Sequence, residues 1–130
     1  MGGLPERFDL PASVGNLLRL EGAAILTGAI LLYAGLGHQW VVFLVLFLAP
    51  DLAMIGYRAN PSLGATTYNL AHCYAVPALI GAVGWWTGTD TAVAVALIWT
   101  AHIGLDRMLG FGLKLPTGFK DTHLGRIGGG

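Results

Sequence analysis

Four long apolar stretches, separated by short polar ones, make up most of the chain. They lie at residues 14–36, 40–57, 63–86 and 92–113. Each has about 18–24 residues, which is enough for a helix to cross about 30 Å of hydrocarbon at about 1.5 Å per residue. Inside a bilayer the backbone groups must bond to one another, which favours helices. The pattern therefore predicts an all-α polytopic membrane protein, a bundle of four transmembrane helices.

Polar segments at the two ends frame this bundle. We divide the chain into a polar N-terminal lead at 1–12, a transmembrane domain at 13–113 and a polar cytoplasmic tail at 114–130. The lead is long and contains Glu6 and Asp9, so the first apolar stretch is interpreted as a retained span and not as a cleaved signal peptide.

The composition strengthens the membrane interpretation. Hydrophobic residues make up 55% of the chain and charged residues only 11%, whereas a soluble domain has about 25% charged residues. The net charge is zero, so nothing indicates nucleic-acid binding. A single cysteine, Cys73, excludes an intrachain disulfide.

The basic residues predict the orientation. The turns at 35–39 and 87–91 contain no lysine or arginine, and every basic residue lies on the other side of the predicted bundle. Because positive charge is retained in the cytoplasm, both termini are expected there.

Acidic and imidazole side chains occur within all four predicted spans, at Glu21, Asp51, His72, His102 and Asp106. At about 1.5 Å per residue they would share one layer roughly 8–16 Å below the cytoplasmic boundary. His102 and Asp106 are four residues apart and so share one helix face. A carboxylate near the bilayer centre costs roughly 2.5–3.5 kcal/mol, which protonation, hydrogen bonding, an arginine or a divalent cation must offset. We expect these five residues to be ligands of zinc, manganese or iron.

Pro50 and several other polar residues are predicted to support this site. Pro50 removes a backbone donor, so a kink is expected beside Asp51. Asn69 lies one turn from His72 and would hydrogen-bond it or a ligand. The tail would fold back as a lid or phosphate-binding arm. The complete set of supporting residues is Asn69, Tyr68, Arg107, Lys114, Asp121 and His123, with Lys120 as a further tail residue.

Each residue also has a purely local explanation. A carboxylate in these spans would pair with a nearby arginine or, at Asp51, cap the backbone that Pro50 frees. A histidine would bond a helix carbonyl, and His102 with Asp106 would form only an intrahelical pair. Arg107 would extend its side chain to the lipid headgroups. The shared depth favours a joint site over these separate explanations.

Six motifs around these residues are similar to those of one known family. They are Leu18-Arg-Leu-Glu21-Gly, Leu48-Ala-Pro-Asp51-Leu, Tyr68-Asn-Leu-Ala-His72, Ala101-His-Ile-Gly-Leu-Asp-Arg107, Gly110-Phe-Gly-Leu-Lys114 and Phe119-Lys-Asp-Thr-His123-Leu-Gly. Together they resemble the domain of unknown function family 4260, which comprises small bacterial integral-membrane proteins. The resemblance implies a four-helix membrane protein of the bacterial inner membrane and supplies no activity.

Three functions are compatible with such a site, beside a purely structural or interaction role. The leading hypothesis is a metal-dependent membrane hydrolase acting on a lipid or another amphiphile, with Glu21, Asp51, His102 and Asp106 as ligands or acid–base groups. The second is a proton- or cation-coupled transporter or channel subunit, which would need a homo-oligomer. The third is a haem-binding redox protein with His72 and His102 as axial ligands. The sequence alone leaves the choice, and with it the status as an enzyme, open.

Overall fold

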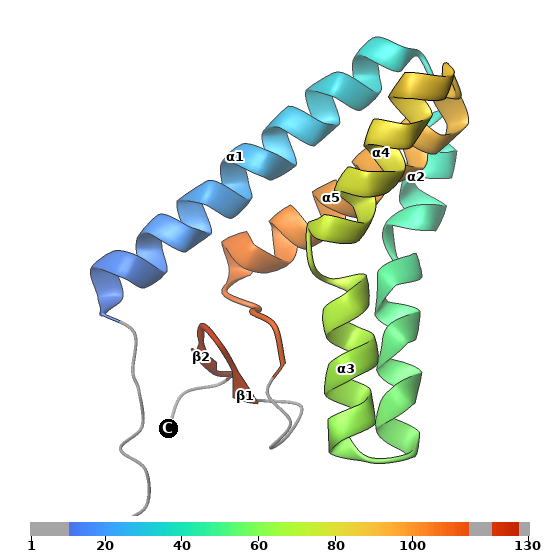
Figure 1. The fold of residues 1–130 in the computed structure, drawn as a ribbon. Helices are drawn as coiled ribbons and strands as arrows, with labels where there is room; N and C mark the ends of the chain where they lie inside the picture. Colours follow the sequence, from blue (N-terminus) through green and yellow to red (C-terminus); the bar gives the residue numbers. More distant parts are fainter. Residues whose placement is uncertain (1–10, 115–120, 128–130) are drawn as a thin grey trace, which may run out of the picture.

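The computed structural model describes residues 11–114 and 121–127, and these form an all-α fold with one short β-hairpin (Figure 1). The elements are α1 (Ala12–Leu36), α2 (Trp40–Phe47), the 3-10 helix η1 (Ala49–Arg58), α3 (Pro61–Ala71), α4 (Ala75–Thr87), α5 (Asp90–Leu109), β1 (Asp121–Thr122) and β2 (Gly125–Arg126). Within these described ranges, three helical segments are long and apolar enough to cross a membrane, at Ala12–Leu36, Trp40–Arg58 and Asp90–Leu109. The predicted all-α membrane fold is confirmed, whereas Lys120 and most of the lead lie outside the described residues.

The second apolar stretch changes helix type at Pro50. The α2 helix ends at Phe47, and η1 continues the same segment as a 3-10 helix with proline in its first turn. A proline there removes a donor that a continuing α-helix would need, whereas the first turn of a new helix leaves its donors unpaired in any case. The disturbance expected at Pro50 therefore takes the form of a tighter helix that begins just before Asp51.

The third apolar stretch is broken, and the prediction of one continuous helix over 63–86 is wrong. The α3 helix ends at Ala71 and α4 begins at Ala75. The reason is Pro77, since a proline ring clashes with the carbonyl four residues earlier, which is that of Cys73. The break leaves the carbonyls of Ala71 and His72 without helical donors, and side chains of α5 bond them instead: Trp99 Nε1 donates to Ala71 and Arg107 Nη2 to His72.

The helix α5 lies at the centre of the fold, because α1, α2 and α4 all pack against it, while η1 packs against α3 (Figure 1). It ends at Leu109 and not at residue 113, since Gly110 adopts a left-handed conformation (φ 89°) that ends the helix. Between α1 and α5 the backbones meet: a Cβ atom at Gly22 would lie 2.7 Å from the Gly104 carbonyl oxygen.

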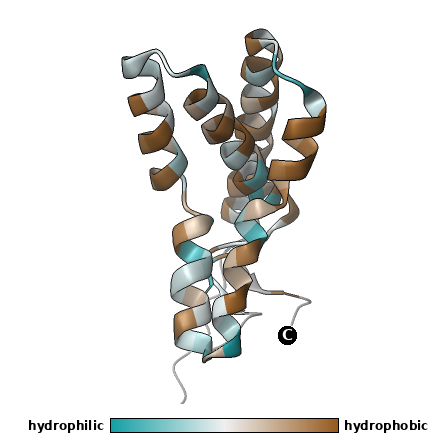
Figure 2. Ribbon diagram, turned by 90° about the vertical axis from the view of Figure 1, so that its right-hand side faces the viewer, coloured by the Kyte–Doolittle hydropathy of each residue, from teal (hydrophilic) through white to brown (hydrophobic). Residues whose placement is uncertain are grey.

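Apolar side chains also cover the outside of the helices. Figure 2 shows hydrophobic residues along their whole length, and large ones such as Leu31, Leu44 and Leu79 are each more than 60% exposed. A soluble monomer rarely exposes so continuous an apolar surface. The two turns without basic residues, before α2 and before α5, lie at the same end of the fold, away from the β-hairpin (Figure 1).

Candidate metal centre

Four of the predicted site residues converge on one point. Asp51 comes from η1, His72 follows the last residue of α3, and His102 and Asp106 come from α5. Each residue offers one ligand atom, and these atoms all lie within 4.8 Å of one another. Both histidines are buried, whereas the Asp106 side chain is 17% exposed and the Asp51 side chain 39% exposed. The centre is therefore closed on the histidine side and open at Asp51.

The distances between the ligand atoms are short and nearly equal. The two histidine Nε2 atoms are 3.1 Å apart. Asp51 Oδ1 lies 3.2 Å from each of them, and Asp106 Oδ2 lies 3.4 Å from His72 Nε2 and 3.3 Å from His102 Nε2. Two donor atoms that each lie about 2.0–2.1 Å from a tetrahedral zinc ion are about 3.4 Å apart. These separations would suit one metal ion, and the four ligand atoms, including the two carboxylate oxygens, all lie within 4.8 Å of one another.

The proton positions favour a cation between these atoms. His72 Nδ1 lies 2.8 Å from the Tyr68 carbonyl oxygen, which only accepts, so Nδ1 must carry the hydrogen. If the His72 ring is neutral, its Nε2 atom carries a lone pair and no hydrogen. This atom faces Asp51 Oδ1, Asp106 Oδ2 and His102 Nε2. With neutral rings and ionised carboxylates, only His102 has a proton to place among these close contacts. A metal ion, or a proton held by His102 or by a carboxylate, would offset the repulsion between lone pairs that face one another.

The residues present fit a divalent metal. Two imidazole nitrogens and two carboxylate oxygens suit zinc, manganese or iron. The bond from His72 Nδ1 to the Tyr68 carbonyl is the orienting bond that metal-binding histidines usually make through their second nitrogen. The cluster is thus able to hold a metal ion, which would stabilise two carboxylates that are costly in an apolar bundle.

Aromatic and basic side chains surround the ligands. The Tyr68 ring stacks on His72 with centroids 3.7 Å apart, and Phe47 packs edge-on against His102 at 5.2 Å. The buried Lys114 ammonium lies 4.8 Å from the Tyr68 ring centroid. Burial lowers the pKa of Lys114, while the carboxylates of the centre act to raise it. The centre is therefore walled by rings, with a cation at its edge.

Arg107 supports the centre through the break between α3 and α4. Its guanidinium donates to the His72 carbonyl oxygen at 3.1 Å and lies 5.9 Å from the centroid of the Tyr74 ring. The arginine thereby holds the backbone of a ligand, whereas the sequence also allowed a side chain that extends to the headgroups.

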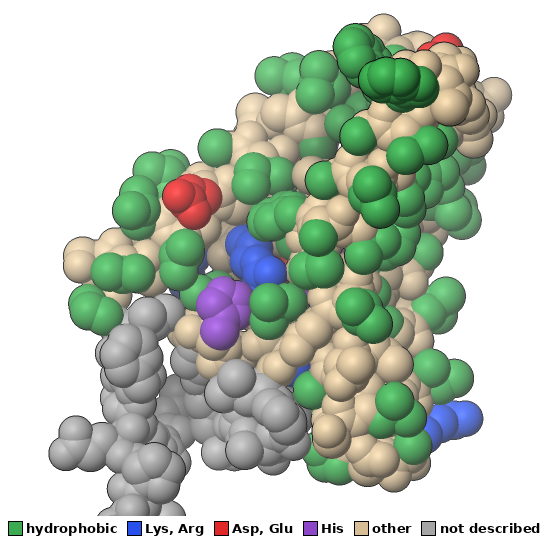
Figure 3. All heavy atoms as spheres, viewed as in Figure 1, with side chains coloured by type: hydrophobic (Ala, Val, Ile, Leu, Met, Phe, Trp, Pro, Cys, Tyr) green, Lys and Arg blue, Asp and Glu red, His purple; other side chains and the backbone are tan. Residues whose placement is uncertain are grey.

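Glu21 lies apart from the four converging residues. Its side chain is exposed on α1 and lines a separate polar cavity of about 110 Å³ together with Arg107, Tyr74 and His123. Figure 3 shows acidic, basic and histidine side chains near one another on this face of the molecule. The structure thus brings four of the five predicted ligands together and leaves Glu21 outside their group.

The Asn69 side chain holds the tail and does not bond the His72 ring, although the Asn69 backbone carbonyl oxygen accepts from the His72 N–H at 3.2 Å. Its amide nitrogen donates to the Lys114 carbonyl oxygen at 2.8 Å, and its amide oxygen accepts from the Lys114 backbone N–H at 2.6 Å. The tail is fixed further because His123 Nδ1 accepts from the Leu113 N–H at 2.8 Å and Thr122 pairs with Lys114. Asp121 lies in β1 of the same hairpin. The first tail residues therefore fold back beside the centre.

Removing the Asn69 amide is expected to release the tail. Asn69→Ala deletes two hydrogen bonds to the Lys114 backbone, a loss of about 1–2 kcal/mol. Because the Lys114 side chain is buried, trypsin must wait for local opening before it cleaves there, so this loss would speed cleavage about 5- to 30-fold. Asn16→Ala, at an exposed position of α1, is the matched control. Equal cleavage rates in both variants would contradict the assigned role of Asn69.

Two aromatic residues next to the centre were not predicted as site residues. Phe47 contacts His102 from α2, and Trp99 bonds the broken end of α3. Trp99 lies one helical turn before His102, and Phe47 lies four residues before Asp51. Their spacing from His102 and Asp51 was the only sequence feature that could have indicated these two residues. It is a weak indication, because aromatic residues are common in apolar spans.

Comparison with known proteins gives one match. The family model described as "Domain of unknown function (DUF4260)" matches residues 15–127, most of the chain. No curated protein and no solved structure matches it. The match confirms the resemblance that the six motifs indicated.

Proposed function

Because the chain belongs to the family with the domain of unknown function DUF4260, whose description names no reaction, we propose a function from the chemistry of its site. The proposal is a metal-dependent membrane hydrolase that acts on a lipid or another amphiphile. One observation carries it: two imidazole nitrogens and two carboxylate oxygens lie within 4.8 Å of one another in a mostly apolar bundle. A bound divalent ion lowers the pKa of water and stabilises negative charge on the bond that is cleaved.

The four residues would divide the work according to their burial. The buried His72 and His102 would hold the ion, with the His72 ring fixed by its bond to the Tyr68 carbonyl. Asp106 would be the third ligand, and Asp51, the most exposed of the four residues, would stay off the ion and accept the proton of the attacking water. That proton then passes to the leaving oxygen as the ester bond breaks.

The positive charges beside the centre favour an anionic ester. The Lys114 ammonium lies over the Tyr68 ring, and the Arg107 guanidinium donates to the His72 carbonyl oxygen. A phosphate or carboxylate near the cleaved bond would therefore meet opposite charge.

We also propose that the protein lies in the bacterial inner membrane with both termini in the cytoplasm. The turns without basic residues, which lie together at the opposite end of the fold, support this orientation.

Elemental analysis of detergent-purified protein, together with hydrolysis of amphiphilic carboxylate and phosphate esters, tests this function. We expect one zinc, manganese or iron ion per chain, and activity that chelation removes and metal restores. Asp51→Asn keeps the shape of the side chain but not its basicity, so the rate is expected to fall at least about 100-fold. Asp90→Asn, at the first residue of α5, is the matched control.

Protein without stoichiometric metal would contradict the hydrolase. In that case, proteoliposome flux that Asp51→Asn abolishes would favour a relay of buried carboxylates and histidines. The haem alternative does not fit the geometry. Axial ligands bind on opposite faces of the macrocycle, whereas the Nε2 atoms of His72 and His102 are in contact at 3.1 Å, with no room for a porphyrin between them.

A further inference from the structure

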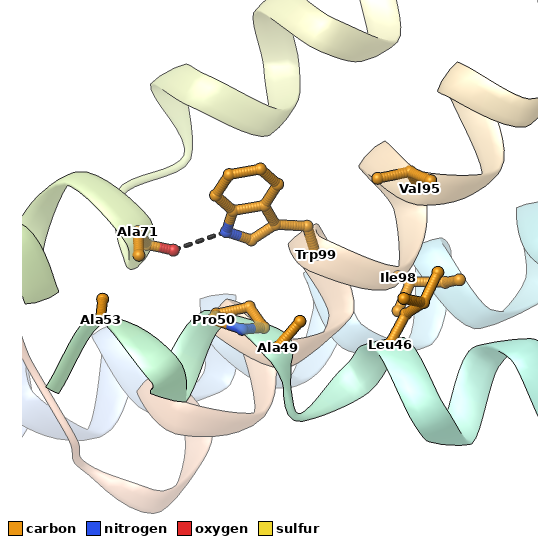
Figure 4. Close-up of a pocket in the computed structure, with 8 residues that line it drawn as sticks. All are labelled: Leu46, Ala49, Pro50, Ala53, Ala71, Val95, Ile98 and Trp99. Atoms are coloured by element: carbon orange, nitrogen blue, oxygen red, sulfur yellow. Dashed lines mark hydrogen bonds between the residues drawn. The ribbon is translucent and has the colours of Figure 1, made fainter. Parts of the chain in front are cut away.

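An apolar cavity of about 320 Å³ lies beside the metal centre (Figure 4). Its walls come from α2, η1, the end of α3 and α5, and no charged residue lines it among those described. The volume is at the lower end of the range of about 300–1,000 Å³ for small-molecule sites. A space of this size and character suits a slender apolar group.

The cavity and the metal centre adjoin each other along the chain at two peptide bonds. Pro50 lines the cavity, and the next residue, Asp51, is the most exposed ligand. A second wall residue, Ala71, directly precedes His72. None of the four ligands lines the cavity itself, so the apolar space begins one residue away from the polar centre and on its open side.

Trp99 stands across the cavity with its polar atom satisfied. The indole N–H donates to the Ala71 carbonyl oxygen that the helix break frees, as the dashed line in Figure 4 shows. The ring is therefore held in place and presents only its apolar surface to the space. The Ala71 carbonyl that the helix break frees is therefore paired in this wall.

The two ends of the cavity differ in side-chain size. Ala53 and Ala71 lie at one end, and Leu46, Val95 and Ile98 lie at the other (Figure 4). On α5, Val95 is seven residues before His102, which is about 10 Å along the helix axis. Ala71, which directly precedes His72, marks the end near the metal centre, and Val95, two helical turns before His102, marks the end remote from it.

We propose that this cavity binds one alkyl chain of the substrate whose polar group is hydrolysed at the metal centre, and that Val95 limits the chain length. The inference rests on the proposed function in one respect, namely that the alkyl chain belongs to a substrate. The chain would enter from the bilayer, because the neighbouring Leu48 and Leu52 are 63% and 76% exposed on the lipid-facing side of the same segment.

A protein with Trp99 as its sole tryptophan tests the proposal by fluorescence. Trp40, Trp85 and Trp86 are exposed and are replaced by phenylalanine. The probes are octanoic and palmitic acids with bromine on the terminal carbon, added to protein in maltoside micelles with and without metal. Bromine quenches indole fluorescence only at contact, so saturable quenching is expected as the chain fills the cavity.

Two substitutions and one matched control make the test specific. Val95→Phe fills the remote end, so palmitic acid should bind at least about tenfold more weakly while octanoic acid is unaffected. Ala53→Leu fills the near end and should weaken both chains. Val45→Phe makes the same change as Val95→Phe at a residue that is 69% exposed and does not line the cavity, and should change neither.

The outcomes separate this inference from the proposed function. Quenching that does not saturate, or that is equal in all three variants, overturns the alkyl-chain site even if the protein binds metal. Saturable quenching that Ala53→Leu and Val95→Phe weaken supports the site even if elemental analysis finds no metal. In that second case the hydrolase fails and the chain site stands.

Discussion

His102→Ala is expected to abolish stoichiometric metal binding and, with it, the sensitivity of the fold to chelation. An ion that binds only the folded protein at about 1,000 times its dissociation constant adds about 4 kcal/mol to the free energy of unfolding. EDTA should therefore destabilise the wild-type protein by about this amount and leave His102→Ala unchanged. Thermal unfolding in detergent, followed by circular dichroism with and without EDTA, measures both effects.

His38→Ala is the control for this prediction. It removes a histidine from the turn between α1 and α2, where the ring packs near Tyr33 and is remote from the four converging residues. The variant should keep its metal and its response to EDTA. If EDTA shifts wild type and His102→Ala equally, or if neither responds, the four residues hold no structural ion.

Gly22→Ala and Gly104→Ala are expected to separate α1 from α5. A Cβ atom at Gly22 would lie 2.6 Å from Arg107 Cβ and 2.7 Å from the Gly104 carbonyl oxygen, and one at Gly104 would lie 2.9 Å from the Gly22 carbonyl oxygen. Because these neighbours are mostly backbone atoms, they cannot yield without moving a whole helix. Overpacking of this kind costs about 1–3 kcal/mol, which thermal unfolding would measure.

Gly28→Ala provides the comparison within the same helix. Nothing lies within 4 Å of a Cβ atom at Gly28, so the substitution adds no clash and raises helix propensity. Its free energy of unfolding should equal or slightly exceed that of wild type. Since α5 also carries His102 and Asp106, the two destabilised variants should bind metal more weakly as well. Equal stability of Gly22→Ala and Gly28→Ala would contradict the close crossing.

Much of the candidate site was predictable because depth in a helical membrane protein is one-dimensional. Counting residues from each predicted helix end put the acidic and imidazole groups in one layer, and four of them meet in the structure. His102 and Asp106 were paired by the helical repeat alone. The disturbance at Pro50 followed from its missing donor.

Rotation about each helix axis was not predictable in the same way. Glu21 has a suitable depth, but its neighbour Gly22 is the residue that meets α5, so Glu21 is turned away and exposed. Depth depends on the number of residues, whereas direction depends on which side chains allow two backbones to approach.

The amino-acid sequence by itself determined the apolar segments, the helical class and the layer in which the charged groups lie, because these depend on hydrophobicity and on the rise per residue. Only the tertiary structure decided that Trp99 and Arg107 bond the carbonyls freed before Pro77, and that a cavity remains beside Asp51. These features arise between segments that are distant in the chain. The way the helices pack decides which side chain lies close enough to donate to an unpaired backbone carbonyl.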